Sequence, residues 1–531
     1  MSPRSAPAPR VEHVVDGALL VDYPEAEEEE ANRAAVALAA FLAARPHAGL
    51  RDTIPGARTL FCEFDPATIA HEALAGLIEA AAPEAGDSGP AREHRVPVLY
   101  GGEAGADLPE LSREAGMSEP ELISLHASVR YRVAFLGFAP GFAYMTGLPA
   151  ALRFPRRSTP RTRVPAGALA VAGPYTGIYP NAGPGGWNLI GSAAFRLFDP
   201  ARQPPASLLP GDRVAFEPVA APDFERALRD APGAPPPGAP RPRATAVLEV
   251  ESPGLWSAPC GAPRYGAGSS GVPPGGAMDQ ASLSAGNAAL GNPEGAAALE
   301  VTVSGPTLAA LEDLVAVLAG APCEALLGRS AIKAGAPFWM ARGERLSIGP
   351  VRDGVRSYLC VAGGLALPDA GPVPRRLETG DLLLRPAGAP SPMPVRIARL
   401  PRISADPVVR IVLGSQVERF SARGVSQLLD SRYRVSAASD RRGVRLEGPP
   451  LEPSRGGAEI FPEGTALGAI QVPPDGQPIV LGPDRPITGG YAKIGTVISA
   501  DFPVLAQARP GSTLRFRSVS LAEAVEARGE R

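Results

Sequence analysis

Glycine and proline interrupt this sequence so often that they dictate its fold class. The chain holds 60 glycines and 62 prolines among 531 residues, and many of them stand at turns between short runs of alternating apolar and polar residues. Because a period of two with such punctuation is typical of strands, the pattern predicts a β-rich fold with many loops. The length predicts about two to four domains, each able to bury its own core.

Composition shifts divide the chain into five parts. A strand-and-helix pattern at the start, with the strands ALLVDY and TLFCEF, predicts a small α+β domain. Runs punctuated by glycine and proline follow it, and then comes a segment whose proline-rich second half suits a linker, because it can neither pack nor pair. Two β-rich parts complete the chain. The predicted boundaries are 10–93, 94–219, 220–245 for the linker, 246–400 and 401–520.

One turn-and-strand pattern recurs in both halves. In each copy a tight turn with glycine leads into an alternating strand: PGDRVAF at Pro210, RGERLSI at Arg342, TGDLLLR at Thr379 and PGSTLRF at Pro510. Turns of this kind lead into the strands of barrels and sandwiches. The recurrence predicts related β-modules in the two halves.

Charge and cysteine usage exclude several classes of protein. A net charge of −3 lacks the basic excess of a nucleic-acid binder, so we expect no nucleic-acid partner. The four cysteines are scattered without a CxxC pair, which indicates a reducing compartment, buried packing roles and no zinc site. Neither an apolar signal segment nor a run of about 18 apolar residues is present, so we expect a cytoplasmic protein without a membrane partner.

The histidines are confined to the first quarter of the chain, where His126 is the last of five. A site in the second half therefore has no histidine of its own to act as a base or metal ligand. Its proton transfers would use carboxylates, lysine, tyrosine, water or substrate. We expect no metal centre.

Two polar, glycine-rich stretches are suited to surround a small anionic substrate. The first runs from Phe135 to Trp187, and the second joins Ser439–Leu451 to Gly468–Asp501. Glycine lets backbone N–H groups approach a ligand, proline stiffens the loops, and arginine and lysine supply positive charge. Both stretches are candidate binding segments.

In the first stretch, the segment PRRSTPRTR carries arginines on a proline-stiffened loop. Arg161 and Arg163 are the preferred pair for a phosphate or carboxylate group, with a solvated surface loop as the alternative. Gly185 and Gly186 could expose N–H groups to an oxyanion, or could simply form a tight turn.

The segment FLGFAPGFAYM could form a substrate wall. Gly141 and Tyr144 are its candidate binding residues, because tyrosine can present a hydroxyl from an apolar body. The alternative is that the aromatic side chains belong to a core. That alternative is stronger for Phe138 than for Tyr144.

In the second stretch, the candidates are Asp440 and Arg441, Gln471, and the cluster from Asp484 to Lys493. Asp484 is a candidate base and Lys493 a candidate ligand for phosphate or carboxylate, and these two are the candidate catalytic residues. Either could instead form a structural ion pair. No segment is a Walker A sequence, so an ATP site would be of another kind.

These stretches carry a family resemblance. FLGFAPGFAYMTGLP, PRRSTPRTRVPAGALAVAGPYTGIYP and GPGGWNLIG resemble the B subunit of bacterial ATP-dependent 5-oxoprolinase, a family also described as kinase-inhibitor-like and as allophanate hydrolase subunit 1. SPGLW, GVPPGGAMD, LEVTVSGPTL, YLCVAGGL, SDRRGVRLEGPPL and GAIQVPPDGQPIVL resemble the C subunit, its biotin-dependent carboxyltransferase-like partner. Together the matches span nearly the whole chain, which is similar to a B–C fusion.

The resemblance implies a mainly β fold with a small N-terminal α+β domain and cyclophilin-like β-barrels in both halves. It also implies a hydrolase that opens the 5-oxoproline lactam to glutamate with ATP, and Mg²⁺ with it, together with a separate A subunit; the chain could also be a homo-oligomer. Two alternatives stay open. One is a biotin-dependent carboxyltransferase acting on urea or a related amide, and the other is a regulatory inhibitor of a sensor histidine kinase.

The second half departs from the family pattern in two places. After SPGLW, Cys260 and Gly261 stand where the family has a Gln-Asp pair, while Arg264 holds the place of the family arginine. After Pro368 a glycine-rich loop is shortened to DAGPVPRRLETGD. If these segments bind substrate or a partner, the C-like half is impaired.

Overall fold

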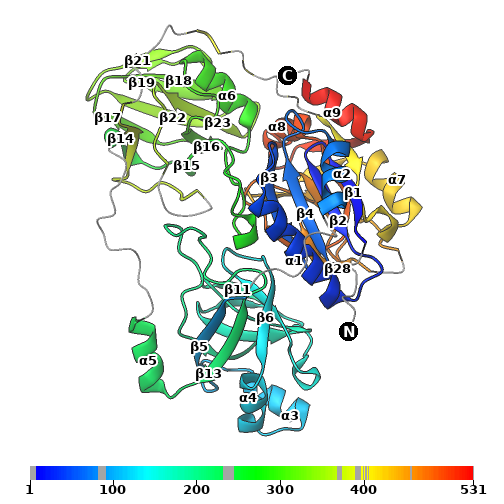
Figure 1. Ribbon diagram of the computed structural model, residues 1–531. Helices are drawn as coiled ribbons and strands as arrows, with labels where there is room; N and C mark the ends of the chain where they lie inside the picture. Colours follow the sequence, from blue (N-terminus) through cyan, green and yellow to red (C-terminus); the bar gives the residue numbers. More distant parts are fainter. Residues whose placement is uncertain are drawn as a thin grey trace.

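The computed structural model describes residues 8–81, 91–230, 244–367, 374–388, 396–398, 400, 404, 406–454 and 457–529. Within them the chain forms a small N-terminal domain, a first closed barrel, a region of two facing sheets and a second closed barrel. The small domain lies beside the second barrel although the two are at opposite ends of the sequence (Figure 1). The predicted mainly β fold with barrels in both halves is confirmed.

The small domain is a four-stranded antiparallel sheet in the order β1-β2-β4-β3. Its elements are β1 Arg10–Val15, β2 Ala18–Asp22, α1 Glu28–Ala44, β3 Leu50–Pro55, β4 Thr59–Phe64 and α2 His71–Ala81. Strands β2 and β4 carry the predicted ALLVDY and TLFCEF, whereas β1 and β3 were not predicted. Successive residues of β2 face opposite sides, so Leu19 packs under the helices while Leu20 packs against the second barrel.

The first barrel closes in the ring order β5-β12-β9-β10-β7-β6-β13, with β13 parallel to β5. Its strands are β5 Glu93–Tyr100, β6 Arg130–Leu136, β7 Ala143–Thr146, β9 Ala168–Ala172, β10 Tyr175–Ile178, β12 Asn188–Ala193 and β13 Arg213–Pro218. Outside the ring, β8 Arg161–Val164 pairs with β11 Gly183–Gly185, and the helices are α3 Leu108–Ala115 and α4 Glu119–Ala127.

The second barrel repeats this plan in the ring order β25-β32-β29-β30-β27-β26-β33, with β33 parallel to β25. Its strands are β25 Val408–Leu413, β26 Tyr433–Val435, β27 Gly443–Glu447, β29 Ala469–Gln471, β30 Ile479–Leu481, β32 Lys493–Val497 and β33 Thr513–Ser518. Outside the ring, β28 Glu459–Gly464 pairs with β31 Thr488–Tyr491, and the helices are α7 Ala422–Asp430, α8 Phe502–Ala506 and α9 Leu521–Gly529.

Each strand of one barrel therefore has a counterpart in the other, including the outer pair β8–β11 and β28–β31. PGDRVAF leads into β13 and PGSTLRF leads into β33, which are the equivalent closing strands. The predicted relation between β-modules of the two halves holds for these two copies. The other two copies lead into β22 and β24 of the region between the barrels.

That region consists of a six-stranded sheet, β20-β19-β22-β17-β14-β24, and a five-stranded sheet, β15-β16-β23-β18-β21. One core lies between them and takes residues from both. Among the described residues the sheets do not close, so this region differs from the barrel predicted for 246–400. Its elements are β14 Ala244–Ser252, β15 Trp256–Cys260, α6 Gln280–Ala289, β16 Ala298–Thr302, β17 Thr307–Ala310, β18 Leu314–Gly320, β19 Cys323–Leu327, β20 Ser330–Ala331, β21 Phe338–Met340, β22 Arg345–Val351, β23 Arg356–Val361 and β24 Leu382–Pro386.

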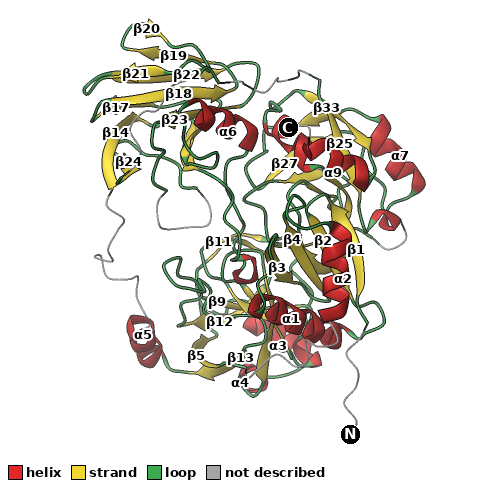
Figure 2. Cartoon of the chain, turned by 45° about the horizontal axis from the view of Figure 1, so that its top comes forward, coloured by secondary structure: helices red, strands yellow, loops and turns green. Residues whose placement is uncertain are grey.

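The two halves of the chain are packed against each other (Figure 2). The Gly141 N–H donates to the Ser270 carbonyl at 3.1 Å, and the Asp52 carboxylate accepts from the N–H groups of Gly266 and Gly268 at 3.0 Å. A Cβ at Gly137 would lie 1.5 Å from the Thr488 hydroxyl oxygen, so only glycine allows this approach. The FLGFAPGF segment thus meets the second half directly.

Part of the predicted linker is helical, since α5 covers Ala221–Asp230, and residues 231–243 lie outside the described residues. None of the helices in the described ranges is long and apolar enough to cross a membrane. Short 3₁₀ turns complete the described elements at Ala150–Leu152, Gly268–Ser270, Val417–Arg419 and Ser499–Asp501.

Candidate functional site

A cavity of about 490 Å³ is lined jointly by the two-sheet region and the second barrel. We call it the Arg441 cavity. Trp256 and Arg356 line it from the sheets, and Asp440, Arg441 and Asp484 line it from the loops of the second barrel. Three of the residues predicted from sequence therefore meet at one cavity.

The Arg441 guanidinium is buried and almost fully used. Nε and Nη2 donate to the Asp484 carboxylate at 2.7 and 3.0 Å, Nη1 donates to Glu300 at 2.7 Å, and Nη2 also donates to the Gly276 carbonyl at 2.6 Å. A guanidinium has five N–H donors, and these contacts use four of them. Among the described residues, one Nη1 proton of Arg441 is left without an acceptor.

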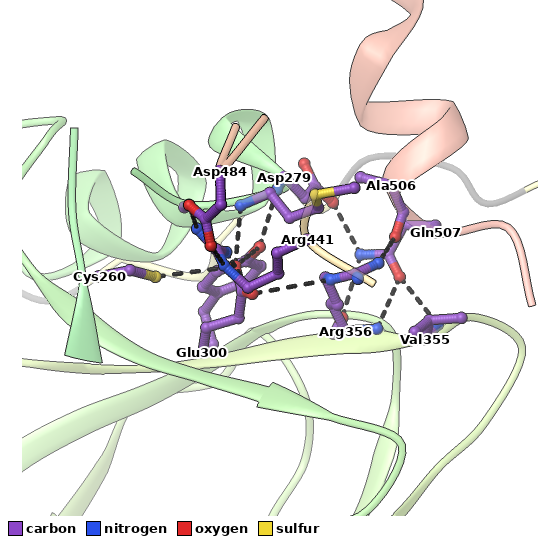
Figure 3. Close-up of polar contacts among 12 residues, drawn as sticks. Cys260, Asp279, Glu300, Val355, Arg356, Arg441, Asp484, Ala506 and Gln507 are labelled. Carbon is purple, nitrogen blue, oxygen red and sulfur yellow. Dashed lines mark hydrogen bonds and ion pairs between the residues drawn. The ribbon is translucent and has the colours of Figure 1, made fainter. Parts of the chain in front are cut away.

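Glu300 on β16 is the residue that holds Arg441 from the opposite domain (Figure 3). Its second oxygen accepts from the Met278 N–H and the Tyr358 hydroxyl, each at 2.8 Å. Burial alone would raise the pKa of Glu300, but the Arg441 and Arg356 guanidiniums keep that pKa below its ordinary value. Glu300 therefore stays ionised although it is fully buried.

Sequence analysis missed Glu300. It lies on β16, at the start of the segment LEVTVSGPTL, and its strand neighbours Leu299 and Val301 are buried in the sheet core. A single carboxylate inside an otherwise apolar strand is the available signal, because a buried charge needs a partner. The sequence does not identify that partner.

A second set of contacts joins the same two domains. The Gln507 side-chain oxygen accepts from the backbone N–H groups of Val355 and Arg356, and its amide donates to Asp279 at 2.7 Å. The Arg356 guanidinium donates to the Ala506 carbonyl (Figure 3). Two sets of buried polar contacts, one around Arg441 and one around Gln507, therefore hold the two-sheet region against the second barrel at the cavity.

Asp484 forms the ion pair that sequence analysis left open as the alternative to a base. Burial raises the pKa of Asp484 above its ordinary value, although the bidentate contact with Arg441 acts in the opposite direction. Asp440 is exposed at the cavity, and one oxygen of its carboxylate accepts from the N–H groups of Arg442 and Gly443 at 2.8 and 3.2 Å. Asp440 thus shapes the loop that carries Arg441.

Lys493 belongs to a different cluster. It begins β32 and is 5% exposed, and its ammonium lies 2.7 Å from Glu463, which also accepts from Gln416. Gln471 on β29 is also buried, and it is the residue that pairs with Lys493 between the strands β29 and β32. Strand pairing carries Lys493 into the barrel, where it is a buried strand residue and not part of an open loop. The structure does not bring Lys493 into the contacts that join Asp484 to Arg441.

In the first barrel, β8 pairs with β11, and this places Arg161 opposite Gly185. Buried Asp107 accepts from Arg161 at 2.6 Å, from Arg157 at 2.8 Å and from the Leu189 N–H at 2.7 Å. Two guanidiniums share one carboxylate, so one positive charge is left over. Sequence analysis missed Asp107, whose position before α3 resembles an ordinary helix cap.

The other candidates of this segment differ in exposure. Arg161 and Arg163 were the preferred pair. Arg161 donates to the buried Asp107, whereas Arg163 is exposed on β8 and is not among the residues that donate to Asp107. Arg161 also stands on a strand, where a loop was expected. The Gly186 carbonyl accepts from the Arg157 N–H at 2.9 Å, which joins the arginine loop to the glycine segment.

The aromatic residues correct one expectation. Phe138 is 47% exposed at a φ of 64°, whereas Tyr144 is 7% exposed and stacks on Phe135 with ring centroids 4.4 Å apart. Tyr144 is therefore the core residue and Phe138 the exposed one, opposite to the prediction. Burial raises the pKa of Tyr144 to about 12, so its hydroxyl stays protonated. The Gly141 N–H is occupied by the contact with the second half.

The candidate loops of the two barrels occupy equivalent places. FLGFAPGF leads into β7 and SDRRG leads into β27, its counterpart. Tyr179 follows β10, and Asp484 follows the equivalent β30. In the first barrel the two loops meet through the Phe142 and Tyr179 rings, 5.3 Å apart, and in the second they meet through the Arg441–Asp484 ion pair.

Cys260 and Gly261, which depart from the family pattern, match the space and the contacts around them in this structure. The Cys260 thiol donates to Glu300 at 3.7 Å, and burial raises its pKa, so it remains a thiol. A Cβ at Gly261 would lie 2.9 Å from the Gly295 carbonyl oxygen. A Gln-Asp pair would not fit this backbone without a shift. Residues 368–373 of the shortened loop lie outside the described residues.

No group of three or more His, Cys, Asp and Glu side chains within the described ranges is arranged to hold a metal ion.

The comparisons with known proteins agree with this architecture. Family models described as carboxyltransferase domain, subdomains C and D, and carboxyltransferase domain, subdomains A and B, match residues 9–208 and 270–518. The crystal structure of TTHA0988 superposes with a TM-score of 0.83 at 37% identity, over 96% of this chain and 100% of that one. The fold and the two domain models define a protein that carries both parts of the carboxyltransferase domain.

The relatives narrow the family. The 5-oxoprolinase B subunit of Bacillus subtilis is 33% identical over 40% of this chain and 95% of its own length. The 5-oxoprolinase C subunit of Haemophilus influenzae is 34% identical over 50% of this chain and 89% of its own length. A putative urea carboxylase of Emericella nidulans is 30% identical over 48% of this chain and 23% of its own length. The chain belongs to the family of the 5-oxoprolinase B and C subunits, with a B-like half and a C-like half in one polypeptide.

Proposed function

We propose that the chain is a fused B/C subunit of an ATP-dependent 5-oxoprolinase, which opens the 5-oxoproline lactam to L-glutamate together with a separate A subunit. The observation that carries this proposal is the Arg441 cavity, where a buried and neutralised ion-pair network leaves one guanidinium donor for a ligand. Relatives named as both subunits support the choice of reaction.

The remaining Nη1 proton of Arg441 suits a single acceptor such as the lactam carbonyl. A donor fixed in place before reaction stabilises the negative charge that develops on a carbonyl oxygen under attack. Glu300 and Asp484 hold the guanidinium in position, and we assign no proton transfer to either carboxylate because both are used by Arg441. The resulting role of this chain is to bind and polarise the substrate.

The cavity does not suit ATP. The buried Arg441 and Arg356 are matched in charge by Glu300 and Asp484, so of the three arginines that line the cavity only the exposed Arg442 is left for an anion, and one positive charge is little for a triphosphate. We therefore assign ATP and Mg²⁺ to the complex with the A subunit, and we derive no step through them in this cavity. Arg161, Arg163, Gly185 and Gly186 remain our candidates for a phosphate or carboxylate group.

The test is ATP-dependent formation of glutamate from 5-oxoproline by the purified chain, with and without a protein that resembles the 5-oxoprolinase A subunit. Activity is expected only with both proteins. Arg441→Lys keeps the positive charge but loses the guanidinium fork, and it should lower kcat at least tenfold while circular dichroism and thermal unfolding show a folded chain. Absence of activity in the wild-type complex would refute the proposal.

A second candidate is a biotin-dependent carboxyltransferase acting on urea or a related amide. It is supported by the carboxyltransferase domain models and by the putative urea carboxylase relative. It requires biotin on another chain. Carboxylation of urea with a biotin carboxylase and carrier, together with no turnover of 5-oxoproline, would favour it.

A further inference from the structure

Arg442 differs from the other arginines of the Arg441 cavity. It lines the cavity and is exposed, and its guanidinium has no hydrogen-bond or ion-pair partner in the part of the chain that the structure describes. The buried Arg441 and Arg356 beside it are held by carboxylate and carbonyl groups. Arg442 therefore brings a complete set of donors to the cavity, whereas Arg441 brings one.

The backbone at Arg442 is fixed although its side chain contacts no partner within the described ranges. The Arg442 N–H donates to the Asp440 carboxylate at 2.8 Å, and the same oxygen accepts from the Gly443 N–H at 3.2 Å. This turn occupies one oxygen of the Asp440 carboxylate with backbone groups, and among the described residues Asp440 forms no ion pair with the neighbouring guanidinium. The guanidinium thus remains available to an anion from outside the protein.

We infer that Arg442 determines specificity by binding the carboxylate of the substrate while Arg441 donates to the amide carbonyl. The inference rests on the proposed function and narrows it to small amides that carry a carboxylate. A guanidinium with free donors binds a carboxylate through two parallel hydrogen bonds, which a guanidinium with a single free proton cannot form. Because residues 441 and 442 are adjacent and both line the cavity, one small molecule can meet both.

The test separates the two substrate groups by calorimetric titration of the full chain without turnover. 5-Oxoproline carries both groups, and 2-pyrrolidinone is the same lactam without the carboxylate. Arg442→Gln should weaken binding of 5-oxoproline by roughly ten- to hundredfold, the loss of one charge-assisted contact, and leave 2-pyrrolidinone binding unchanged. The matched control is Arg445→Gln, an exposed arginine three residues away that does not line the cavity. It should bind both compounds like the wild type.

Three results would overturn the inference. They are equal weakening of both compounds by Arg442→Gln, no weakening of either, and no binding of 5-oxoproline to the folded wild-type chain. The complex with the A subunit distinguishes this failure from failure of the proposed function. If the wild-type complex makes glutamate while Arg442→Gln does not raise the KM for 5-oxoproline, only the role of Arg442 is wrong. If the wild-type complex makes none, the proposed function is wrong.

Discussion

Replacing Glu300 by glutamine should weaken the contact between the two-sheet region and the second barrel. Every contact of the Glu300 carboxylate is with a donor: the Arg441 and Arg356 guanidiniums lie on one oxygen, and the Met278 N–H, the Tyr358 hydroxyl and the Cys260 thiol on the other. A glutamine offers one oxygen and one NH₂ group, so in either orientation its NH₂ group faces a donor. One buried group then loses its acceptor whichever way the amide turns.

The expected cost follows from burial. Removing one partner of a buried ion pair costs about 3 to 5 kcal/mol, whereas a half-exposed pair contributes less than about 1 kcal/mol. Glu312→Gln is the matched control, because Glu312 pairs with Arg385 at 2.7 Å in the same region with side chains 38% and 27% exposed. The same substitution of glutamate by glutamine is thus made once in a buried ion pair and once in an ion pair at the protein surface.

Differential scanning calorimetry and urea unfolding of the full chain would measure the two variants. Glu300→Gln should lower the stability of the transition that includes the second half by about 3 kcal/mol or more, and Glu312→Gln by less than about 1 kcal/mol. Because the chain has several domains, each transition is compared with its wild-type counterpart. Equal effects of the two variants would refute the reasoning that Glu300 is a structural charge of the cavity.

Three further predictions follow from other contacts. Lys493→Met should destabilise the chain by about 3 kcal/mol, because Glu463 is left buried without its cation; urea unfolding that matches the wild type would contradict this. Arg161→Ala should leave stability nearly unchanged, since Asp107 keeps its contact with Arg157, but should weaken phosphate or carboxylate binding roughly tenfold or more in titrations. Burial raises the pKa of Asp52 from 3.8 to about 6, so its contribution to stability is present at low pH and is lost as pH rises through about 6. From pH 7 to 5 the wild type should therefore gain about 1 kcal/mol relative to Asp52→Asn, and an equal pH response of both proteins would argue against this shift.

Limited proteolysis tests the domain division, which remains a prediction. The segment 220–245 has the composition of a linker, so we expect a protease to cleave the chain there first. Early cleavage inside the first barrel would contradict it.

The local patterns of the sequence determined much of the fold. Turn residues and alternation predicted the strands β2 and β4 and the β-rich halves, because strand pattern and turn chemistry depend on neighbouring residues. The turns before β13 and β33 even marked the equivalent closing strands of two barrels. The polar loops containing Arg441 and Asp484 were also visible, since a segment of that polarity does not fit a core.

The tertiary structure alone decided which of these residues act together. Arg441 meets Glu300 across 141 positions of the chain, and Asp107 meets Arg161 across 54. Strand pairing placed Lys493 inside a barrel, and Phe138, in the turn between β6 and β7, is exposed against the local expectation. Periodicity and turn residues report only on neighbours along the chain, whereas burial and ion pairing depend on which distant segments pack together. For that reason the sequence could name Arg441 as a site residue but could not show that its partners leave one donor for a ligand, or that Arg442 beside it has no partner among the described residues.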